Sequence, residues 1–424
     1  MAIKILTTGD IHLGKVSSST PARSSEVATK NTWQKIVNYA IENEVDAVAL
    51  TGDIIDQDNR YYEAIGPLQI GFEKLNNAGI SVIIVAGNHD FEVLPQIMRH
   101  QKTTSNVHFL GNKGTWETKT ITIKNQKIQF VGWSFPTLHY NRNPMSSFDS
   151  KMVNSNHIVV GLVHGDVGNL KSQYAPINLH DFYNTQVDVW LLGHIHKPQI
   201  LNEAKPLIIY PGSPHAMSPK EQGIHGPFVL NIHTKESIEI QQTPLSLVRY
   251  ELLEFDCTGK DDVESLRNSA TSFVYDEANQ KELYNVRHLV YDLRLIGKQK
   301  NIEELTIWAE NIKGYRFDIH ETKVSIRKIE IDVEPTIENI EELAKGESII
   351  AVLAQSIIAL QNNETTPFLE KIKTDWKSVD TIKKAPIYTP LKNSQIESMT
   401  EKEEINQLLL KECNHILSNL LNQQ

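Results

Sequence analysis

The sequence predicts an α/β fold for the first part of the chain, followed by a smaller α+β domain and a C-terminal helical region. Three observations indicate this. Short apolar runs alternate with helix-length segments up to about residue 240, each apolar run stops at a polar motif, and the order of elements changes after residue 247. The 424 residues are also enough for two or three domains, because single cores stop growing near roughly 250 to 300 residues.

The apolar runs of the first domain, residues 1–240, have the length and composition of buried strands. Two segments between them, Glu26–Glu44 and Tyr62–Ala78, are predicted to be helices that cover the sheet. Strands of one sheet that all end in polar loops can gather those loops along one edge, so the dispersed motifs are expected to form one site. The predicted strands are Ile3–Thr8, Ala47–Leu50, Val82–Ala86, Ile158–Val163 and Val189–Leu192.

A small α+β domain is predicted over residues 247–333, where strands and helices alternate until Pro335 closes the pattern. The histidines support a boundary before this domain, since 13 of the 16 precede residue 241. Histidine chemistry is therefore expected in the first domain. The predicted elements of the small domain are Leu247–Phe255, Val263–Phe273, Arg287–Ile296, Ile302–Ile312 and Arg316–Val333.

The last part of the chain, residues 336–424, is predicted to be helical over Ile337–Leu360 and Ile405–Leu421, with an exposed linker near 377–395 that contains two prolines. Apolar residues recur at three- and four-residue steps along the last helix. That stripe fits a helix packed on its own protein and equally a helix that binds a partner, and the sequence does not separate the two.

The net charge of −10 is uneven, with 20 Lys+Arg against 21 Asp+Glu in residues 1–240 and 22 against 31 in the remainder. Proteins that bind nucleic acid through its backbone usually have a basic balance, which this chain lacks. Two bound divalent ions would still provide a local positive centre for phosphate. The charge weakens a nucleic-acid function without excluding it.

Cys257 and Cys413 are the only cysteines, which is too few for a disulfide framework and the wrong spacing for a zinc site. The N-terminus enters an apolar run at Ile3 without a charged leader, and no apolar stretch approaches the roughly 20 residues that span a bilayer. A soluble cytoplasmic protein without membrane partners is expected.

The first two motifs each follow a predicted strand. Asp10-Ile11-His12 points two ligand side chains the same way, because the residue between them occupies the other face. After the second strand comes Gly52-Asp53, where glycine lets the chain turn sharply and the carboxylate reach between two ions. Alone, the first motif is weak support for a metal site.

The string Gly87-Asn88-His89-Asp90 is more specific, because it places an amide oxygen, an imidazole and a carboxylate in consecutive positions after a strand. The structural alternative is an Asn-stabilised turn followed by a helix that begins at Asp90. With the other motifs present, a functional role is favoured.

Histidines complete the set. His164 follows one strand, and Gly193-His194-Ile195-His196 follows the next with two imidazoles that can face one site. A single histidine more often serves the core or the surface, but in this company His164 is expected to be a ligand. The predicted metal ligands are therefore Asp10, His12, Asp53, Asn88, His164, His194 and His196.

Mixed His, Asp and Asn ligands with a shared carboxylate favour manganese, with iron, zinc or magnesium as alternatives. Two divalent ions about 3.5 to 4 Å apart bind one phosphate and lower the pKa of a shared water from about 15.7 toward about 7. The motifs thus predict hydrolysis of a phosphate ester.

The order and spacing of these motifs resemble the calcineurin-like metallophosphoesterase superfamily, and within it the SbcD-type nuclease subunit of double-strand-break repair complexes. The resemblance covers residues 1–240, helped by Tyr210-Pro211-Gly212-Ser213-Pro214, Glu221-x-Gly223 and Gly226-Pro227-Phe228. It implies a layered αββα sandwich, with residues 247–333 as a capping domain over bound DNA.

The resemblance also implies roles for the ligands. Asp10, His12, Asp53 and His196 would hold one ion, and Asp53, Asn88, His164 and His194 the other, so that Asp53 bridges. His89 would protonate or stabilise the leaving oxygen, with Asp90 as its orienting partner. Asp56 lies at a position that varies in the family, and is assigned at most an indirect role beside the metal pair.

The partners that the resemblance implies are DNA, an SbcC-type coiled-coil ATPase held by the C-terminal helices, and a second copy of the chain. The homodimer would form through Tyr62–Ala78 and residues 91–100, although packing within the chain explains these helices as well. The expected function is a manganese-dependent DNA exonuclease and endonuclease in repair or recombination. The alternatives are a phosphatase or small-molecule phosphodiesterase on the same site, and a subunit that uses the intact site for binding alone.

Overall fold

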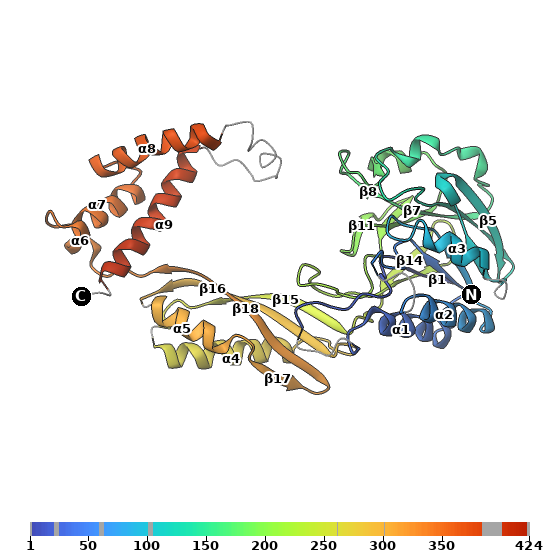
Figure 1. Ribbon diagram of the computed structural model, residues 1–424, viewed down its shortest axis with the longest axis horizontal. Coiled ribbons are helices and arrows are strands. Elements are labelled where there is room, and N and C mark those ends of the chain that lie inside the picture. The colour runs from blue at the N-terminus through green and yellow to red at the C-terminus, as the bar shows by residue number, and fades with distance from the viewer. Residues whose placement is uncertain are drawn as a thin grey trace. The chain divides into compact units, whose positions relative to one another are not determined.

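The computed structural model describes residues 2–20, 25–58, 63–100, 105–260, 262–300, 302–383 and 401–421. These residues form two compact units (Figure 1). The first unit comprises residues 1–251, 280–291 and 316–327, and the second comprises residues 252–279, 292–315 and 328–424. The predicted domain limits at 240, 247–333 and 336 stay predictions.

The first unit contains two six-stranded sheets. In the first sheet, β1, β2, β3 and β4 are parallel neighbours, and β13 joins the free edge of β1 in antiparallel orientation. The predicted strands Ile3–Thr8 and Ala47–Leu50 are observed at the predicted residues. The order is β14 (Ile238–Gln242), β13 (Phe228–Ile232), β1 (Ile3–Thr8), β2 (Ala47–Leu50), β3 (Ser81–Ile84) and β4 (Val107–Phe109).

The second sheet has a parallel centre in which β7 lies between β6 and β10. Gly193 at the end of β10 is paired with His164 at the end of β7, so both strands finish at the same level. The order is β11 (Gln199–Asn202), β12 (Leu207–Tyr210), β10 (Val189–Gly193), β7 (Ile158–His164), β6 (Gln126–Trp133) and β5 (Trp116–Ile123).

Hydrophobic residues from the facing sides of both sheets form one core, which includes Ile5, Ile83 and Phe130. On its other side the first sheet packs against α1 (Thr29–Glu42), α2 (Ile65–Asn77) and α3 (Val93–His100). The outer side of the second sheet is covered by loops and short 3₁₀ helices at 144–147, 150–152 and 179–182. The predicted layered α/β fold is confirmed, with 3₁₀ helices in the place of its fourth layer.

The α+β part contains a four-stranded sheet in the order β15 (Val248–Asp256), β16 (His288–Gln299), β18 (Thr322–Pro335) and β17 (Arg316–Ile319). Its helices are α4 (Val263–Asn279) and α5 (Ile302–Ile312). The single strand predicted over 316–333 is wrong. This segment is an antiparallel hairpin that turns at His320, whose φ is 50°. The turn was missed because neither glycine nor proline marks it.

The C-terminal helices are α6 (Ile340–Leu343), α7 (Ile349–Gln361), α8 (Pro367–Lys383) and α9 (Glu401–Leu421). The helix predicted over 337–360 is divided at Gly346, and the Ser348 side chain caps α7 by accepting from the Ala351 N–H at 3.1 Å. Helix α8 was not predicted. It includes the first residues of the predicted linker, whose residues 384–395 lie outside the described part.

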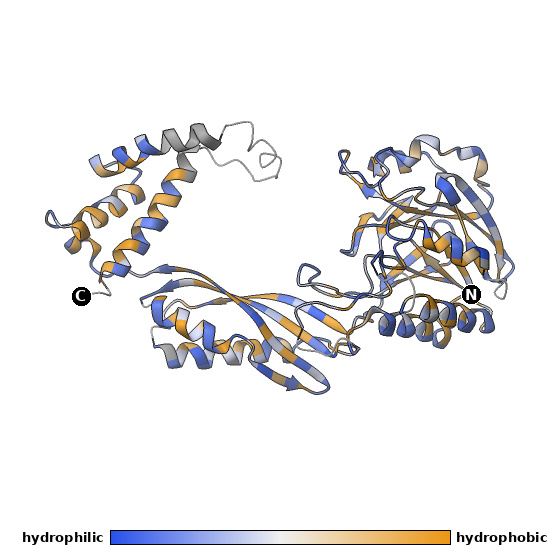
Figure 2. Ribbon diagram, viewed as in Figure 1, coloured by the Kyte–Doolittle hydropathy of each residue, from blue (hydrophilic) through white to orange (hydrophobic). Residues whose placement is uncertain are grey.

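The apolar stripe of α9 packs on α7, the most hydrophobic helix of this unit (Figure 2). Leu409, Cys413 and Leu417 are buried, while Leu408 and Ile416 are 40% and 48% exposed. Packing on its own protein therefore explains the buried part of the stripe and leaves Leu408 and Ile416 partly in solvent. Among the described helices, none has the length and apolar character to cross a membrane.

Candidate metal centre

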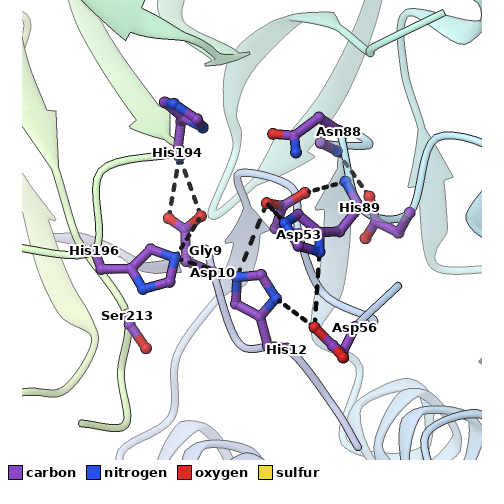
Figure 3. A network of polar contacts seen from close by, with 12 residues as sticks. Gly9, Asp10, His12, Asp53, Asp56, Asn88, His89, His194, His196 and Ser213 are labelled. Atoms are coloured by element: carbon purple, nitrogen blue, oxygen red, sulfur yellow. Dashed lines mark hydrogen bonds and ion pairs between the residues drawn. The ribbon is translucent and has the colours of Figure 1, made fainter. Parts of the chain in front are cut away.

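The predicted ligands lie where the parallel strands of both sheets end. Asp10 follows β1, Asp53 follows β2 and Asn88 follows β3, while His164 ends β7 and His194 directly follows β10. Parallel strands present their carboxyl ends at one edge of a sheet, and the two sheets stack with these edges together. The structure thus brings residues from five motifs into one site. Figure 3 labels the residues of this site except His164.

One group of ligand atoms comes from Asp10, His12 and His196, whose candidate ligand atoms all lie within 4.8 Å of one another. The Nε2 atoms of His12 and His196 are 3.2 Å apart. His196 Nε2 lies 4.0 Å from Asp10 Oδ1. Two imidazole nitrogens that face each other beside a carboxylate form a donor set that suits a borderline divalent ion.

A second group comes from Asp10, Asp53 and His164, all of them buried. His164 Nε2 lies 3.4 Å from Asp53 Oδ2 and 3.2 Å from Asn88 Oδ1. His12 Nε2 approaches the same Asp53 oxygen at 3.9 Å. Asp53 Oδ2 therefore lies between the two groups, where a bridging ligand would be. The residues fit a pair of metal ions.

His194 differs from the other predicted ligands. Its backbone N–H donates to both carboxylate oxygens of Asp10, at 3.1 and 3.2 Å. Its ring lies beside those of His164 and Tyr174, with centroid distances of 5.4 and 5.0 Å, and it belongs to neither of the two groups above. Burial and the nearby His164 lower the pKa of His194 to about 3, which keeps the ring neutral.

Burial and neighbouring charge act differently on the two carboxylates of the centre. Burial raises the pKa of Asp10. Burial acts on Asp53 in the same direction, but the imidazoles around it outweigh that effect and hold its pKa well below the ordinary value. Burial would lower the pKa of His164, yet the Asp53 carboxylate raises it to about 9. Asp53 therefore keeps its negative charge to lower pH than Asp10 does.

His89 lies at the rim of the centre, with 29% of its side chain exposed. Its Nε2 is 4.0 Å from Asp53 Oδ2, and its Nδ1 is 3.7 Å from Asp56 Oδ1. Asp56 is 2% exposed and also lies 3.3 Å from His12 Nδ1. The carboxylate that faces His89 is thus that of Asp56, to which the sequence assigned at most an indirect role.

Asp90 does not have the contacts expected of an orienting partner for His89. Its oxygens accept from the backbone N–H groups of Gly87 at 2.8 Å, Ile54 at 2.7 Å and Ile55 at 3.3 Å. Burial and the nearby Asp53 raise the pKa of Asp90 to about 7. Asp90 thus joins the backbone of the loops that follow β2 and β3. The structure corrects the prediction that Asp90 orients the His89 ring, because its carboxylate positions the backbone instead.

The backbone at the centre is strained. Asp10, His12 and Asp53 have φ values of 49°, 48° and 51°, and His194 has 102°, in a region that non-glycine residues rarely adopt. Such strain persists where the surrounding structure enforces it, and it clusters at functional sites. The backbone is also closely packed here, because a Cβ on Gly87 would lie 2.1 Å from Asp53 Oδ1.

Two further groups at the centre were not assigned from the sequence. Glu221 Oε1 lies 2.7 Å from His196 Nδ1, and the Thr51 carbonyl lies 3.0 Å from His164 Nδ1. Both oxygens accept, so each fixes the proton on Nδ1 and leaves Nε2 to face the centre. The Glu221 motif was quoted for the family resemblance, but no local signal linked it to His196.

Residues 3–198 match the family described as Calcineurin-like phosphoesterase. The matched segment contains all seven predicted ligands and strands from both stacked sheets. Residues 3–198 are therefore similar to the calcineurin-like phosphoesterases, the superfamily that the motifs resemble.

Three proteins with similar sequences extend this comparison. It is similar to the uncharacterized metallophosphoesterase YhaO of Bacillus subtilis (strain 168), with 30% identity over 46% of this chain and 48% of that protein. The DNA double-strand break repair protein Mre11 of Sulfurisphaera tokodaii is 23% identical over 80% of this chain and 86% of its own length. The D component of the nuclease SbcCD from B. subtilis is 22% identical over 52% of this chain and 64% of its length.

The chain thus spans about half the length of YhaO, and its relation to the SbcD-type subunit is more distant than its relation to YhaO. Among solved structures, TT1561 of Thermus thermophilus is similar with a TM-score of 0.37 and 12% identity, over 57% of this chain and 99% of that one.

Proposed function

We propose that this protein is a two-metal DNA nuclease that hydrolyses phosphodiester bonds. The observation that carries the proposal is the position of Asp53, whose Oδ2 lies within 4.0 Å of the Nε2 atoms of His12, His89 and His164. A single buried anion surrounded by imidazoles suits a bridge between two cations, with His89 on the solvent side as the group that meets the substrate.

Divalent ions bound here would supply the positive charge that binds a phosphate and activates a water molecule. His89 would donate a proton from Nε2 to the leaving oxygen, because this nitrogen faces the centre at the exposed rim. Asp56 would keep the other proton on Nδ1 and stabilise the positive ring. The remaining buried residues exclude bulk water and hold these groups in place.

DNA as the substrate is supported by the similarity to Mre11, which extends over 80% of this chain and hence past the matched family segment. One observation favours the second candidate, a phosphatase or small-molecule phosphodiesterase. The first 240 residues are nearly neutral and the rest is acidic, so the chain has no general attraction for a nucleic-acid backbone.

The partners are also part of the proposal. A coiled-coil ATPase of the SbcC type would bind the C-terminal helices, where Leu408 and Ile416 are exposed on α9. A homodimer would form through α2 and α3, and Ile70 of α2 is 53% exposed. Manganese is the proposed metal.

The test is hydrolysis of end-labelled duplex and single-stranded DNA beside a chromogenic phosphodiester and a phosphomonoester, with manganese, magnesium or chelator. His89→Ala should lose roughly 10²- to 10⁴-fold in hydrolysis and keep its metal content. His233→Ala is the matched control, since His233 is a surface residue paired with Glu239 at 3.7 Å. Loss of metal from the His89 variant would contradict its assigned role.

Hydrolysis of the small esters with intact DNA, even after addition of a candidate ATPase and ATP, would replace the nuclease by the second candidate. An absence of all metal-dependent hydrolysis would favour a binding function for the site.

A further inference from the structure

One carboxylate oxygen beside the centre has three nitrogen neighbours. Asp56 Oδ1 lies 2.9 Å from Lys15 Nζ, 3.3 Å from His12 Nδ1 and 3.7 Å from His89 Nδ1. Asp56 Oδ2 accepts from the Asp58 N–H at 3.3 Å and so is turned toward its own loop. A single oxygen does not form three good hydrogen bonds at once. Lys15 makes the shortest contact and His89 the longest.

Lys15 is also placed to meet a ligand. Its side chain is 36% exposed, close to the 29% of His89 and the 30% of His196, whereas Asp56 and His12 are buried. A molecule that enters from solvent therefore meets these three nitrogen-bearing side chains. Lys15 differs from the two histidines in carrying an ammonium group on a flexible four-carbon stem instead of an aromatic ring.

The backbone of Lys15 is fixed while its side chain is not. Its N–H donates to the His12 carbonyl at 3.0 Å, and its carbonyl accepts from the Thr29 N–H at 3.0 Å and from Thr29 Oγ1 at 3.1 Å. The flexible four-carbon stem can then move the ammonium group from one anion to another without a change in the loop.

We propose that Lys15 binds a phosphate oxygen of the substrate, and that its transfer from Asp56 to the phosphate releases Asp56 Oδ1 to His89 Nδ1. The inference rests on the proposed phosphoester hydrolysis. Lys15 couples substrate binding to the alignment of His89, because His89 obtains its carboxylate partner when the phosphate is present. A phosphate is a strong competitor for the ammonium group, since it offers charged oxygens outside the protein interior.

Binding of inorganic phosphate to the manganese-loaded full chain, measured by isothermal titration calorimetry, tests the proposal without turnover. Lys15→Met removes the charge and keeps the length, and should weaken phosphate binding about tenfold. Lys15→Arg keeps the charge and should bind phosphate nearly as the natural chain does. Manganese affinity, measured separately, should be the same in all three proteins.

Lys124→Met is a matched control. Lys124 also pairs with an aspartate, at 2.7 Å from Asp46 Oδ2, and its side chain is 35% exposed. Asp46 precedes β2 and Asp53 follows it, so this pair lies at the opposite edge of the sheet. The control should leave phosphate binding and hydrolysis unchanged.

Kinetics on whichever ester is hydrolysed give a second readout. In Lys15→Met the loss should fall on KM rather than kcat, because Asp56 is then available to His89 at all times. Unchanged phosphate affinity in Lys15→Met, an equal loss in Lys15→Arg, or a parallel loss of manganese would overturn the proposal. If no ester is hydrolysed, the proposed function fails, while the phosphate titration still decides the role of Lys15.

Discussion

Acceptor oxygens behind the imidazole rings decide which nitrogen faces the centre. The Thr51 carbonyl and Glu221 accept from the Nδ1 atoms of His164 and His196, respectively, and Asp56 Oδ1 lies 3.3 Å from His12 Nδ1. The rings of His164 and His196 are thereby turned so that Nε2 points into the shared space. Glu221 is itself fixed, because its second oxygen accepts from the Met217 N–H. These residues act through the histidines rather than on the substrate.

Removal of the Glu221 carboxylate should weaken metal binding. Glu221→Ala frees the His196 ring to rotate, and loss of such a supporting partner costs roughly 10- to 100-fold in metal affinity. Glu221→Gln retains an acceptor oxygen and should recover most of that affinity. Calorimetric titration with manganese measures both, and a full loss in the Gln variant would show that charge rather than orientation is required.

At the scale of the elements, glycines next to the ligands allow the strand ends to approach. A Cβ on Gly193 would lie 2.1 Å from the Thr51 carbonyl oxygen, which accepts from His164. Gly87 has the same relation to the Asp53 carboxylate. Since backbone or a buried ligand would have to move, these positions do not accept a side chain without a change in the centre.

Gly87→Ala should therefore displace Asp53 and abolish stable metal binding, because its Cβ would lie 2.1 Å from Asp53 Oδ1. Gly66→Ala is the control, since a Cβ there meets nothing within 4 Å. Gly66 lies in the first turn of α2 and not at a strand end, so Gly66→Ala should leave metal content unchanged. Metal content and chemical denaturation test the pair, and normal metal content in Gly87→Ala would contradict the expectation.

Helix α9 offers a second matched pair. Leu417 is fully buried against α7. Leu417→Ala should lower the stability of the second compact unit, called the helical unit because it contains α4 to α9, by about 2 to 5 kcal/mol. Its neighbour Ile416 is 48% exposed, so Ile416→Ala should leave stability nearly unchanged. Denaturation followed by circular dichroism distinguishes them. A similar effect of both changes would mean that Ile416 is packed as tightly as Leu417.

At the scale of the whole molecule, the metal centre joins the strand ends of two sheets within one of the two compact units. Metal bound by the folded state alone stabilises it by roughly 2.7 kcal/mol at a free concentration of 100 times Kd. The helical unit has its own core, which includes Leu353, Ile357 and Leu417, and contributes none of the candidate ligands.

Removal of metal with a chelator should consequently lower the melting temperature of the first unit, which holds the candidate ligands, and leave that of the helical unit unchanged. Differential scanning calorimetry with manganese and with chelator measures this, and the Leu417→Ala variant identifies the transition of the helical unit. Equal shifts of both transitions would indicate that the units unfold together.

Much of the fold could be predicted from local pattern. Strands such as Ala47–Leu50 are continuous apolar runs, because they are buried on both faces. The errors occurred where local signals were weak or ambiguous. The hairpin at His320 lacks a typical turn residue, and α8 is too polar to stand out beside the apolar α7.

By itself, the sequence determined that acidic, amide and imidazole side chains lie at the strand ends, because each motif contains them next to a strand and parallel strands gather those ends. The tertiary structure alone decided how each group is held. It turned Asp90 toward the backbone and Asp56 toward His89, and it brought Glu221 to His196 from 25 residues away. Those contacts depend on the stacking of two sheets and on long loops, and no pattern of neighbouring residues encodes them.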